Sequence, residues 1–290
     1  MKYIGILVLF LMLIGCENSE LSDALITQTP VEMTYCRLPV ATSNNVALGI
    51  PKLEGLAPST GQVNVTVLFV DFDDVPATIS PDSVFSILNP IAPDFFKEVS
   101  YGRMQLNFQP HLKWLRLSKS SLHYGSGLRA FQPHLDFIQE AVNLADDEVD
   151  FSQTNIVLVM ANPDAPALPV GPAMNSMDIE YSIQADGARI TTGITSGYDL
   201  TKWGGLWLAH EMGHSLSLPD LYSYTSGTPF PYTGTFSLMG DIAGKAPTYF
   251  AFERWMLGWL DDDQIYCHSS GGEVIVDLTA LEKPGGTKAI

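Results

Sequence analysis

The sequence predicts an α/β (α+β) fold built on a mixed, twisted sheet. Two apolar runs rich in β-branched residues, 63–74 and 154–161, have the length and composition of buried strands. Segments with helical spacing of apolar residues lie between these runs and after them. Strands that alternate with helices predict a sheet covered by helices. At 290 residues, of which 46% are hydrophobic and 16% charged, the chain can bury a sizeable core.

The segments between the two apolar runs follow in chain order. A Ser-Pro pair opens a predicted helix at 80–89, and a second helical pattern occupies 92–102. The segment 103–117 alternates like a strand and contains Pro110, which predicts a hairpin broken at that residue. The segment 130–147 carries apolar residues on one face and predicts a long amphipathic helix.

A short alternating segment flanked by glycines, 187–197, predicts one more strand. This strand is either an ordinary surface strand or an exposed sheet edge. An exposed edge has unpaired main-chain groups that can hydrogen-bond to an extended peptide.

The first sixteen residues predict a secretory signal, because one Lys precedes an apolar run too short to span a membrane comfortably. The run ends in Leu13-Ile14-Gly15-Cys16, which resembles the lipobox of bacterial lipoproteins. Cleavage before Cys16 and acylation of its thiol would anchor an exported protein to a bacterial membrane, facing the periplasm or the exterior. The alternative is a plain signal peptide with an incidental cysteine.

Three further segments follow the signal. Residues 17–61 are polar and predict a linker or pro-like segment, part of which can lie against the domain. Residues 62–265 form the predicted main folded domain. Residues 266–290 begin a new strand pattern, which predicts the start of a C-terminal β region that continues beyond Ile290. Apart from Cys16, only Cys36 and Cys267 remain, and an exported protein can pair them in a disulfide.

The charge of the chain bears on its partners. Thirty-two acidic residues against fifteen basic ones give a formal net charge of −17, which would repel a phosphate backbone and argues against nucleic acid as a partner. The acids Asp71, Asp73 and Asp74 and the run at 146–150 offer oxygen ligands of the kind that Ca²⁺ prefers. Such runs are more often solvated surface or strand ends.

The motif HExxH, formed by His210, Glu211 and His214, carries the functional prediction. Positions i and i+4 share one face of a helix, so the two imidazoles can converge on one ion. The carboxylate beside the first histidine is placed to take a proton from water on a zinc ion, which lowers the pKa of that water. The alternative is a pair of core histidines bonded to backbone carbonyls.

A catalytic zinc site needs a third protein ligand, for which two acids are candidates. Asp220 follows Pro219, which cannot continue the helix and turns the chain back over the metal. Glu253 would require a second helix to cross the first. The sequence therefore favours Asp220.

The stretch HEMGHSLSLPDLY resembles the metzincin pattern in its Asp-ending form, and most closely the immune inhibitor A family of bacterial secreted metallopeptidases. The family's Leu-Pro-Asp-x-Tyr segment is matched at 218–222. Supporting similarity lies in VLFVDFDD (67–74), FFKEVSYGRMQL (95–106), Tyr124, FSLMG (236–240) and GKAPTYFAFERWMLGWL (244–260). The resemblance covers most of residues 61–265.

This resemblance implies a metzincin-like fold with an active-site helix and a Met-turn. It implies one catalytic Zn²⁺ on His210, His214 and Asp220, with Glu211 as general base and Met239 as the apolar floor under the ligands. Tyr222, Tyr232 or Tyr249 would assist the oxyanion, and the spacing does not choose among them.

One position departs from the pattern. Ser217 stands where metzincins have Gly, and a serine in a left-handed conformation costs about 1 kcal/mol.

The sequence as a whole predicts a lipid-anchored zinc metalloendopeptidase that hydrolyses proteins or peptides outside the cytoplasm. The alternative is a catalytically inactive surface lipoprotein that uses the same fold to bind a protein or polysaccharide, with a structural metal. A structural zinc site is closed by four protein ligands, whereas a catalytic site keeps one position open.

Overall fold

The computed structural model describes residues 30–40, 45–225, 233–245 and 247–290. The predicted signal peptide, the lipidation at Cys16 and the candidate Tyr232 lie outside the described residues. Within these ranges, no helix has the length and apolarity needed to cross a membrane.

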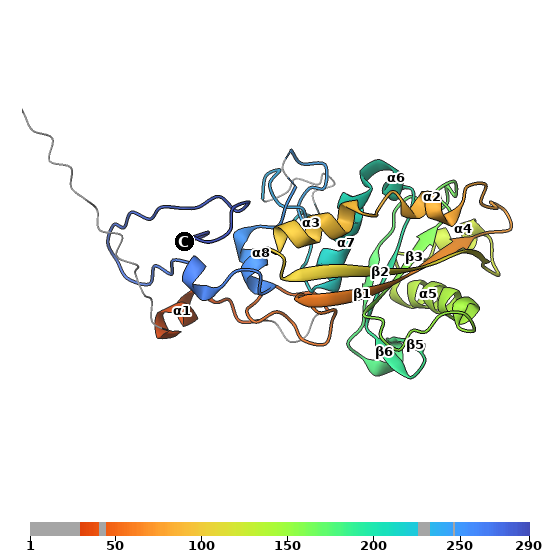
Figure 1. Cartoon of the computed structure of the whole chain (residues 1–290), viewed down its shortest axis with the longest axis horizontal. Coiled ribbons are helices and arrows are strands. Elements are labelled where there is room, and N and C mark those ends of the chain that lie inside the picture. The colour runs from red at the N-terminus through yellow and green to blue at the C-terminus, as the bar shows by residue number, and fades with distance from the viewer. Residues whose placement is uncertain (1–29, 41–44, 226–232, 246) are drawn as a thin grey trace, which may run out of the picture.

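A five-stranded sheet with the order β2-β1-β3-β7-β4 forms the centre of the molecule (Figure 1). Four strands run parallel and β4 pairs antiparallel with β7, so the fold is α/β with a mixed sheet, as predicted. A separate hairpin pairs β5 with β6. The strands are β1 (Gly61–Asp71), β2 (Met104–Arg116), β3 (Ile156–Ala161), β4 (Ala173–Asn175), β5 (Ile183–Ala185), β6 (Ala188–Ile190) and β7 (Thr192–Thr195).

Helices cover both faces of the sheet, because the continuous apolar sequences of β1 and β3 bury side chains on both sides. One face packs against α3 and α7, and the other against α5 (Figure 1). The helices are α1 (Pro30–Cys36), α2 (Pro81–Phe85), α3 (Ile91–Val99), α4 (Ser121–Gly125), α5 (Phe131–Ala145), α6 (Asp199–Trp203), α7 (Gly205–Ser215) and α8 (Ala251–Met256).

The prediction of a hairpin at 103–117 is wrong. This segment is the single long strand β2, which lies parallel to β1 at one edge of the sheet. Pro110 is accommodated because an edge strand has one side without ladder partners, and because the pairing is irregular there. Val67 pairs with Pro110, but Phe69 already pairs with Trp114, so two extra residues of β2 bulge at this point.

The prediction that 187–197 forms one strand, with a possible exposed edge, is also wrong. The segment divides into β6, in the separate hairpin, and β7, which is buried between β3 and β4. The edge of the sheet beside β7 is β4, which is only three residues long, and the other edge is β2. Its sequence Ala-Met-Asn is too short for periodicity and contains no β-branched residue, so it leaves no strand signal.

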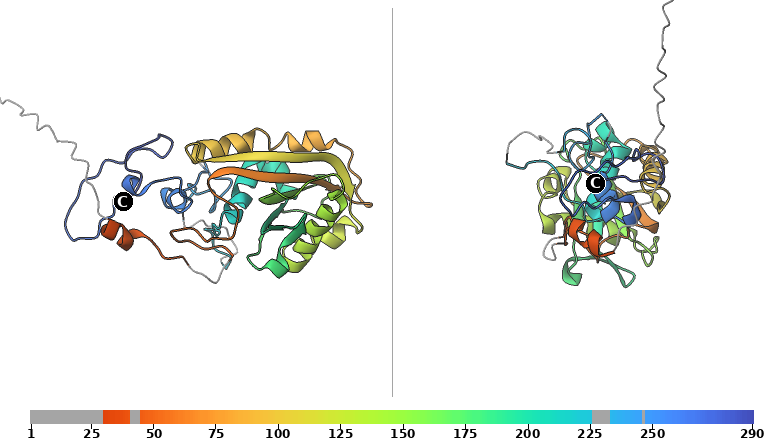
Figure 2. Two further views of the ribbon diagram at one scale, coloured as in Figure 1. Left: turned by 60° about the horizontal axis from the view of Figure 1, so that its bottom comes forward. Right: turned by 90° about the vertical axis from the view of Figure 1, so that its left-hand side faces the viewer.

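The two ends of the described chain lie side by side at one end of the molecule (Figures 1 and 2). Cys36 of α1 and Cys267 form a disulfide with a Cα–Cα distance of 5.8 Å. The segment before β1 also packs on the core, because Leu53, Leu56 and Ala57 are buried. Part of the predicted linker 17–61 therefore belongs to the folded unit.

The C-terminal segment does not form the predicted strand. Residues 273–280 have no regular secondary structure, and Ile275 is 91% exposed. The pairing that ties this segment down is an isolated bridge between Ile265 and Ala289. The alternating sequence at 273–278 finds no neighbouring strand, and a strand needs a partner to form.

Candidate metal centre

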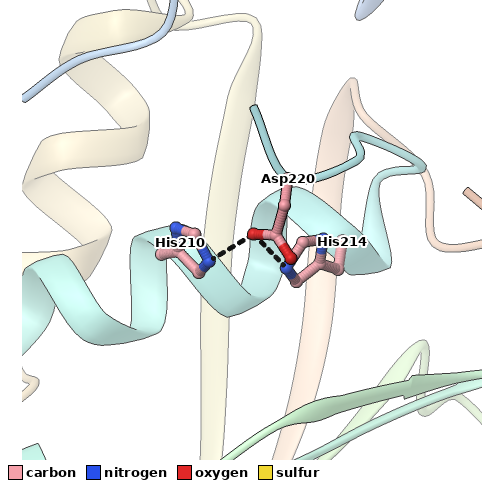
Figure 3. Close-up of side chains that lie close together, drawn as sticks. All are labelled: His210, His214 and Asp220. Atoms are coloured by element: carbon pink, nitrogen blue, oxygen red, sulfur yellow. Dashed lines mark ion pairs between the residues drawn. The ribbon is translucent and has the colours of Figure 1, made fainter. Parts of the chain in front are cut away.

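Helix α7 carries the HExxH motif through the core of the domain. It follows Gly204, whose φ of 51° lets the chain turn sharply between α6 and α7. Its apolar residues pack against α3 and the sheet, and Trp207, Leu208 and Met212 are fully buried. His210 and His214 lie one turn apart with ring centroids 5.0 Å from each other (Figure 3).

The end of α7 brings Asp220, the predicted third ligand, beside the histidines. Ser217 N–H donates to the His214 carbonyl and Leu218 N–H to the Gly213 carbonyl, both at 2.9 Å. These two bonds form a Schellman motif, whose left-handed residue is usually glycine. Here Ser217 adopts it, with a φ of 85°, at a cost of about 1 kcal/mol. Asp220 then lies over the two histidines (Figure 3).

The three side chains converge closely. Asp220 Oδ1 lies 3.1 Å from His210 Nε2 and 3.4 Å from His214 Nε2. Two ligands at 2.0–2.1 Å from a tetrahedral zinc are roughly 3.3 Å apart, so this spacing fits zinc. Among the described residues, these three are the ones that combine into a possible metal site.

The hydrogen bonds of the imidazoles favour a cation at this point. Nδ1 of His210 lies 2.9 Å from the Leu238 carbonyl, and Nδ1 of His214 lies 2.8 Å from the Leu218 carbonyl. A carbonyl only accepts, so each Nδ1 must carry the hydrogen, and each neutral ring then presents a lone pair at Nε2. Asp220 Oδ1 is buried without a hydrogen-bond partner. Two nitrogen lone pairs and a carboxylate oxygen that face each other fit a shared metal ion.

Protons compete with a metal for this space. Burial lowers the pKa of His214, but the carboxylates of Asp220 and Glu211 raise it by more, to about 9. Burial raises the pKa of Asp220, yet the two histidines, whose Nε2 atoms lie within 3.4 Å of its carboxylate, hold it well below its usual range. The metal-free protein therefore keeps a proton between His214 and Asp220, which a bound metal would displace.

The Glu211 side chain extends from α7 to the edge strand β4. Its Oε2 accepts a hydrogen bond from the N–H of Ala173, in β4, at 2.8 Å. Burial raises the pKa of Glu211 above its ordinary value, although the nearby histidines oppose this effect. A raised pKa makes the carboxylate a stronger base than an exposed glutamate.

Met239 lies against α7 at Gly213, which stands between the two histidines in sequence. It is fully buried, and a Cβ built on Gly213 would come within 2.4 Å of its Sδ atom. Leu221 N–H donates to the Met239 carbonyl at 2.8 Å, which ties the segment after Asp220 to the Met239 turn. A glycine between the two histidines thus lets the turn approach the helix closely.

Glu253, the other acid considered for the third ligand, has different partners. Its Oε2 accepts from the Phe250 N–H at 2.6 Å and its Oε1 lies 3.4 Å from Ser237 Oγ. Burial raises the pKa of this carboxyl to about 7. The carboxylate braces the start of α8 and the turn before Met239 instead of joining the histidines.

The tyrosines named for the oxyanion differ in their surroundings. Tyr249 is fully buried and its hydroxyl donates to the Ala209 carbonyl at 2.6 Å, so it holds α7 in place. The ring of Tyr222 lies 5.2 Å from that of Tyr224. The Tyr224 hydroxyl donates to Asp220 Oδ2, whereas the contacts to the histidines are made by Oδ1.

The acids considered for calcium have partners within the protein. Asp71 and Asp73 form ion pairs with Arg116, and Asp74 accepts from the N–H and hydroxyl of Ser121. In the run at 146–150, Glu148 forms an ion pair with Lys113. These contacts to Arg116, Ser121 and Lys113 link the carboxylates to neighbouring parts of the protein.

Several residues around the site carry no sequence motif. Ala173 and Asn175 belong to the short edge strand, and the Asn175 side chain donates to the His214 carbonyl at 2.7 Å. The carbonyls of Leu218 and Leu238 set the histidine tautomers. Backbone groups and a three-residue strand have no residue-type signature, so the sequence could not indicate them.

Comparisons with known proteins add a distant likeness. No protein-family model and no curated protein matches the chain. Among solved structures, metalloproteinase-II from Bacteroides fragilis is similar over 71% of this chain and 55% of that one, with a TM-score of 0.41 and 10% sequence identity. The chain thus spans about half the length of that protein. Because this likeness is so distant, the metal centre rests on the contacts described above.

Proposed function

We propose that the protein is a zinc-dependent endopeptidase that hydrolyses peptide bonds of proteins. The convergence of His210 Nε2, His214 Nε2 and Asp220 Oδ1 at zinc-ligand spacing carries this proposal. Bound zinc would supply a Lewis acid that polarises the scissile carbonyl and lowers the pKa of a coordinated water.

The chain's own residues would handle the proton. Glu211 is next to His210 in sequence, and burial raises the pKa of its carboxyl, which makes it a stronger base. It would take a proton from the attacking water and pass it to the leaving amine. The Leu238 and Leu218 carbonyls would keep both imidazoles in the ligating tautomer.

The position of the edge strand β4 is an argument for a peptide substrate. Thr195 N–H donates to the Pro172 carbonyl and Ser176 N–H to the Thr191 carbonyl, so the even-numbered residues of this segment face β7. The main-chain groups of Ala173 and Asn175 therefore face away from the sheet. The Ala173 N–H is already bonded to Glu211 and the Asn175 carbonyl to the Asn45 side chain, so an extended peptide would pair with the Ala173 carbonyl and the Asn175 N–H.

The finer assignment follows the sequence resemblance. We propose an exported protein of the immune inhibitor A type, anchored through a lipid at Cys16. The alternative of a binding protein with a structural zinc would need a fourth protein ligand. The cluster found among the described residues has three.

The test compares the purified protein with Glu211→Gln, in parallel with Glu98→Gln, the same change at an exposed position of α3. We expect one zinc per chain in all three proteins. Cleavage of a denatured protein should fall by about 10²–10⁴-fold in Glu211→Gln alone, because general-base catalysis contributes that factor. Equal cleavage by Glu211→Gln and the unmodified protein would contradict the role of Glu211. Zinc binding without any cleavage would contradict the peptidase.

A further inference from the structure

A segment far from the motif in sequence touches the metal centre. Residues 45–50, called here the N-terminal strap, run beside the end of α7 (Figure 2). Ala47, which is buried, donates its N–H to the Ser217 carbonyl at 2.8 Å. The side-chain amide of Asn45 donates to the Asn175 carbonyl at 2.9 Å.

One of these bonds reaches the turn before Asp220 directly, at Ser217, and the other reaches it through Asn175. Asn175, held by Asn45 from one side, donates its own side-chain amide to the His214 carbonyl at 2.7 Å. The His214 and Ser217 carbonyls lie at the C-terminus of α7, where helix carbonyls lack partners within the helix. The strap therefore contributes to the hydrogen bonding of the turn from His214 to Ser217.

The strap is itself fixed at its other end. Ile50 N–H donates to the Leu38 carbonyl at 2.8 Å, which brings the strap back beside α1. The disulfide between Cys36 and Cys267 ties α1 to the C-terminal segment. Leu48 and Ile50 pack against the core that also contains α7. The strap is thus held independently of the turn that it contacts.

We propose that the N-terminal strap is a positioning element of the metal centre. Asn45, acting through Asn175, and Ala47, acting through Ser217, hold the turn that keeps Asp220 on the two histidines. Groups that orient metal ligands typically change metal affinity by about 10–100-fold when they are lost. The inference rests on the metal centre of the proposed function and does not depend on cleavage of any substrate.

The test removes one strap contact at the surface. Asn45 is exposed, so Asn45→Ala leaves the core intact, and Asn143→Ala on α5 makes the same truncation on the other face of the sheet. Zinc affinity is measured by competition with a chelator, and the ligand arrangement by the visible absorption of the cobalt-substituted protein. We expect Asn45→Ala to weaken zinc binding by about tenfold. Its cobalt spectrum should change, while its metal-free thermal midpoint should equal that of the unmodified protein.

Ala47→Pro removes the N–H that bonds to Ser217 and gives a second variant with the same expected effects. Unchanged zinc affinity and cobalt spectrum in Asn45→Ala would overturn the proposal. An equal loss of zinc affinity in Asn143→Ala would also overturn it. The same holds if the loss of zinc affinity in Asn45→Ala comes with lower metal-free stability and an unaltered cobalt spectrum. No zinc in the unmodified protein would overturn the metal centre and the strap together. Zinc binding without cleavage would refute the peptidase alone.

Discussion

Histidines are buried on both faces of the sheet, and they differ in the group that lies beside Nε2. On the α5 face, His134 is 2% exposed and its Nε2 lies 2.8 Å from the Thr195 hydroxyl. On the α7 face, each imidazole donates its Nδ1–H to a backbone carbonyl, and its Nε2 faces Asp220. A hydroxyl can donate or accept and so satisfies a neutral ring, whereas a carboxylate can only accept. Burial alone does not indicate a metal; a lone pair that faces an acceptor does.

The largest expected effect removes the charge that distinguishes the α7 face. Asp220→Asn keeps the shape of the side chain but gives the histidines a neutral partner. We expect zinc affinity to fall by more than about 100-fold, since loss of a ligand should exceed the usual effect of an orienting group. Chelator competition would measure it, and Asp73→Asn, at an exposed acid, is the control. Unchanged affinity would mean that the α7 histidines do not form a metal site with Asp220.

The second effect concerns the α5 face. Burial lowers the pKa of His134 to about 4, below the ordinary value of 6.5. The unfolded chain therefore takes up a proton first as the pH falls. The stability that neutral His134 provides is complete above pH 6.5 and is lost progressively down to about pH 4. Between pH 7 and pH 5 the free energy of unfolding should fall by about 2 kcal/mol because of this residue.

Urea unfolding of the metal-free protein and of His134→Gln at pH 7 and pH 5 would measure this contribution, because the contributions of other groups cancel in the difference. The variant should show a pH dependence smaller by about 2 kcal/mol. Identical pH dependence in both proteins would mean that His134 is protonated as readily in the folded as in the unfolded state.

The third effect probes how closely the α7 face is packed. Gly213→Ala places a methyl group against Met239 Sδ, and overpacking of this kind costs about 1–3 kcal/mol. Met239→Ala alone should destabilise by leaving a cavity. The double variant should lose less stability than the sum of the losses in the two single variants. Strict additivity in thermal unfolding would show that Gly213 and Met239 do not touch.

The smallest expected effect is a stabilisation. Ser217→Gly relieves the left-handed conformation and removes a buried hydroxyl without a hydrogen-bond partner. The greater freedom of glycine in the unfolded chain offsets part of this gain. We expect a net increase of about 1 kcal/mol in the free energy of unfolding, with zinc affinity unchanged. Destabilisation would show that the Ser217 side chain has a partner that matters.

The sequence predicts best what depends on local spacing. The buried strands β1 and β3 and helix α5 follow from composition and periodicity. The structure brings His210 and His214 together because i and i+4 share a helix face, and it places Asp220 beside them after the break at Pro219.

What the sequence did not predict depends on pairing across long distances. The parallel partner of β2 and the edge position of β4 are set by neighbours that no local pattern specifies. The bonds from Asn45 to Asn175 and from Ala47 to Ser217 join residues more than a hundred positions apart. Such contacts leave no periodic trace, and an exposed asparagine looks like any other polar residue of a linker.

The disulfide between Cys36 and Cys267 spans 231 positions and so makes a covalent ring that contains the sheet and the metal centre. A single break in the backbone anywhere inside that ring leaves one molecule of unchanged mass apart from a water. If a surface loop inside the ring is cut once, the product will run as one band in a denaturing gel until a thiol is added, and as two fragments afterwards. Damage that would separate an open chain into pieces would leave this one joined.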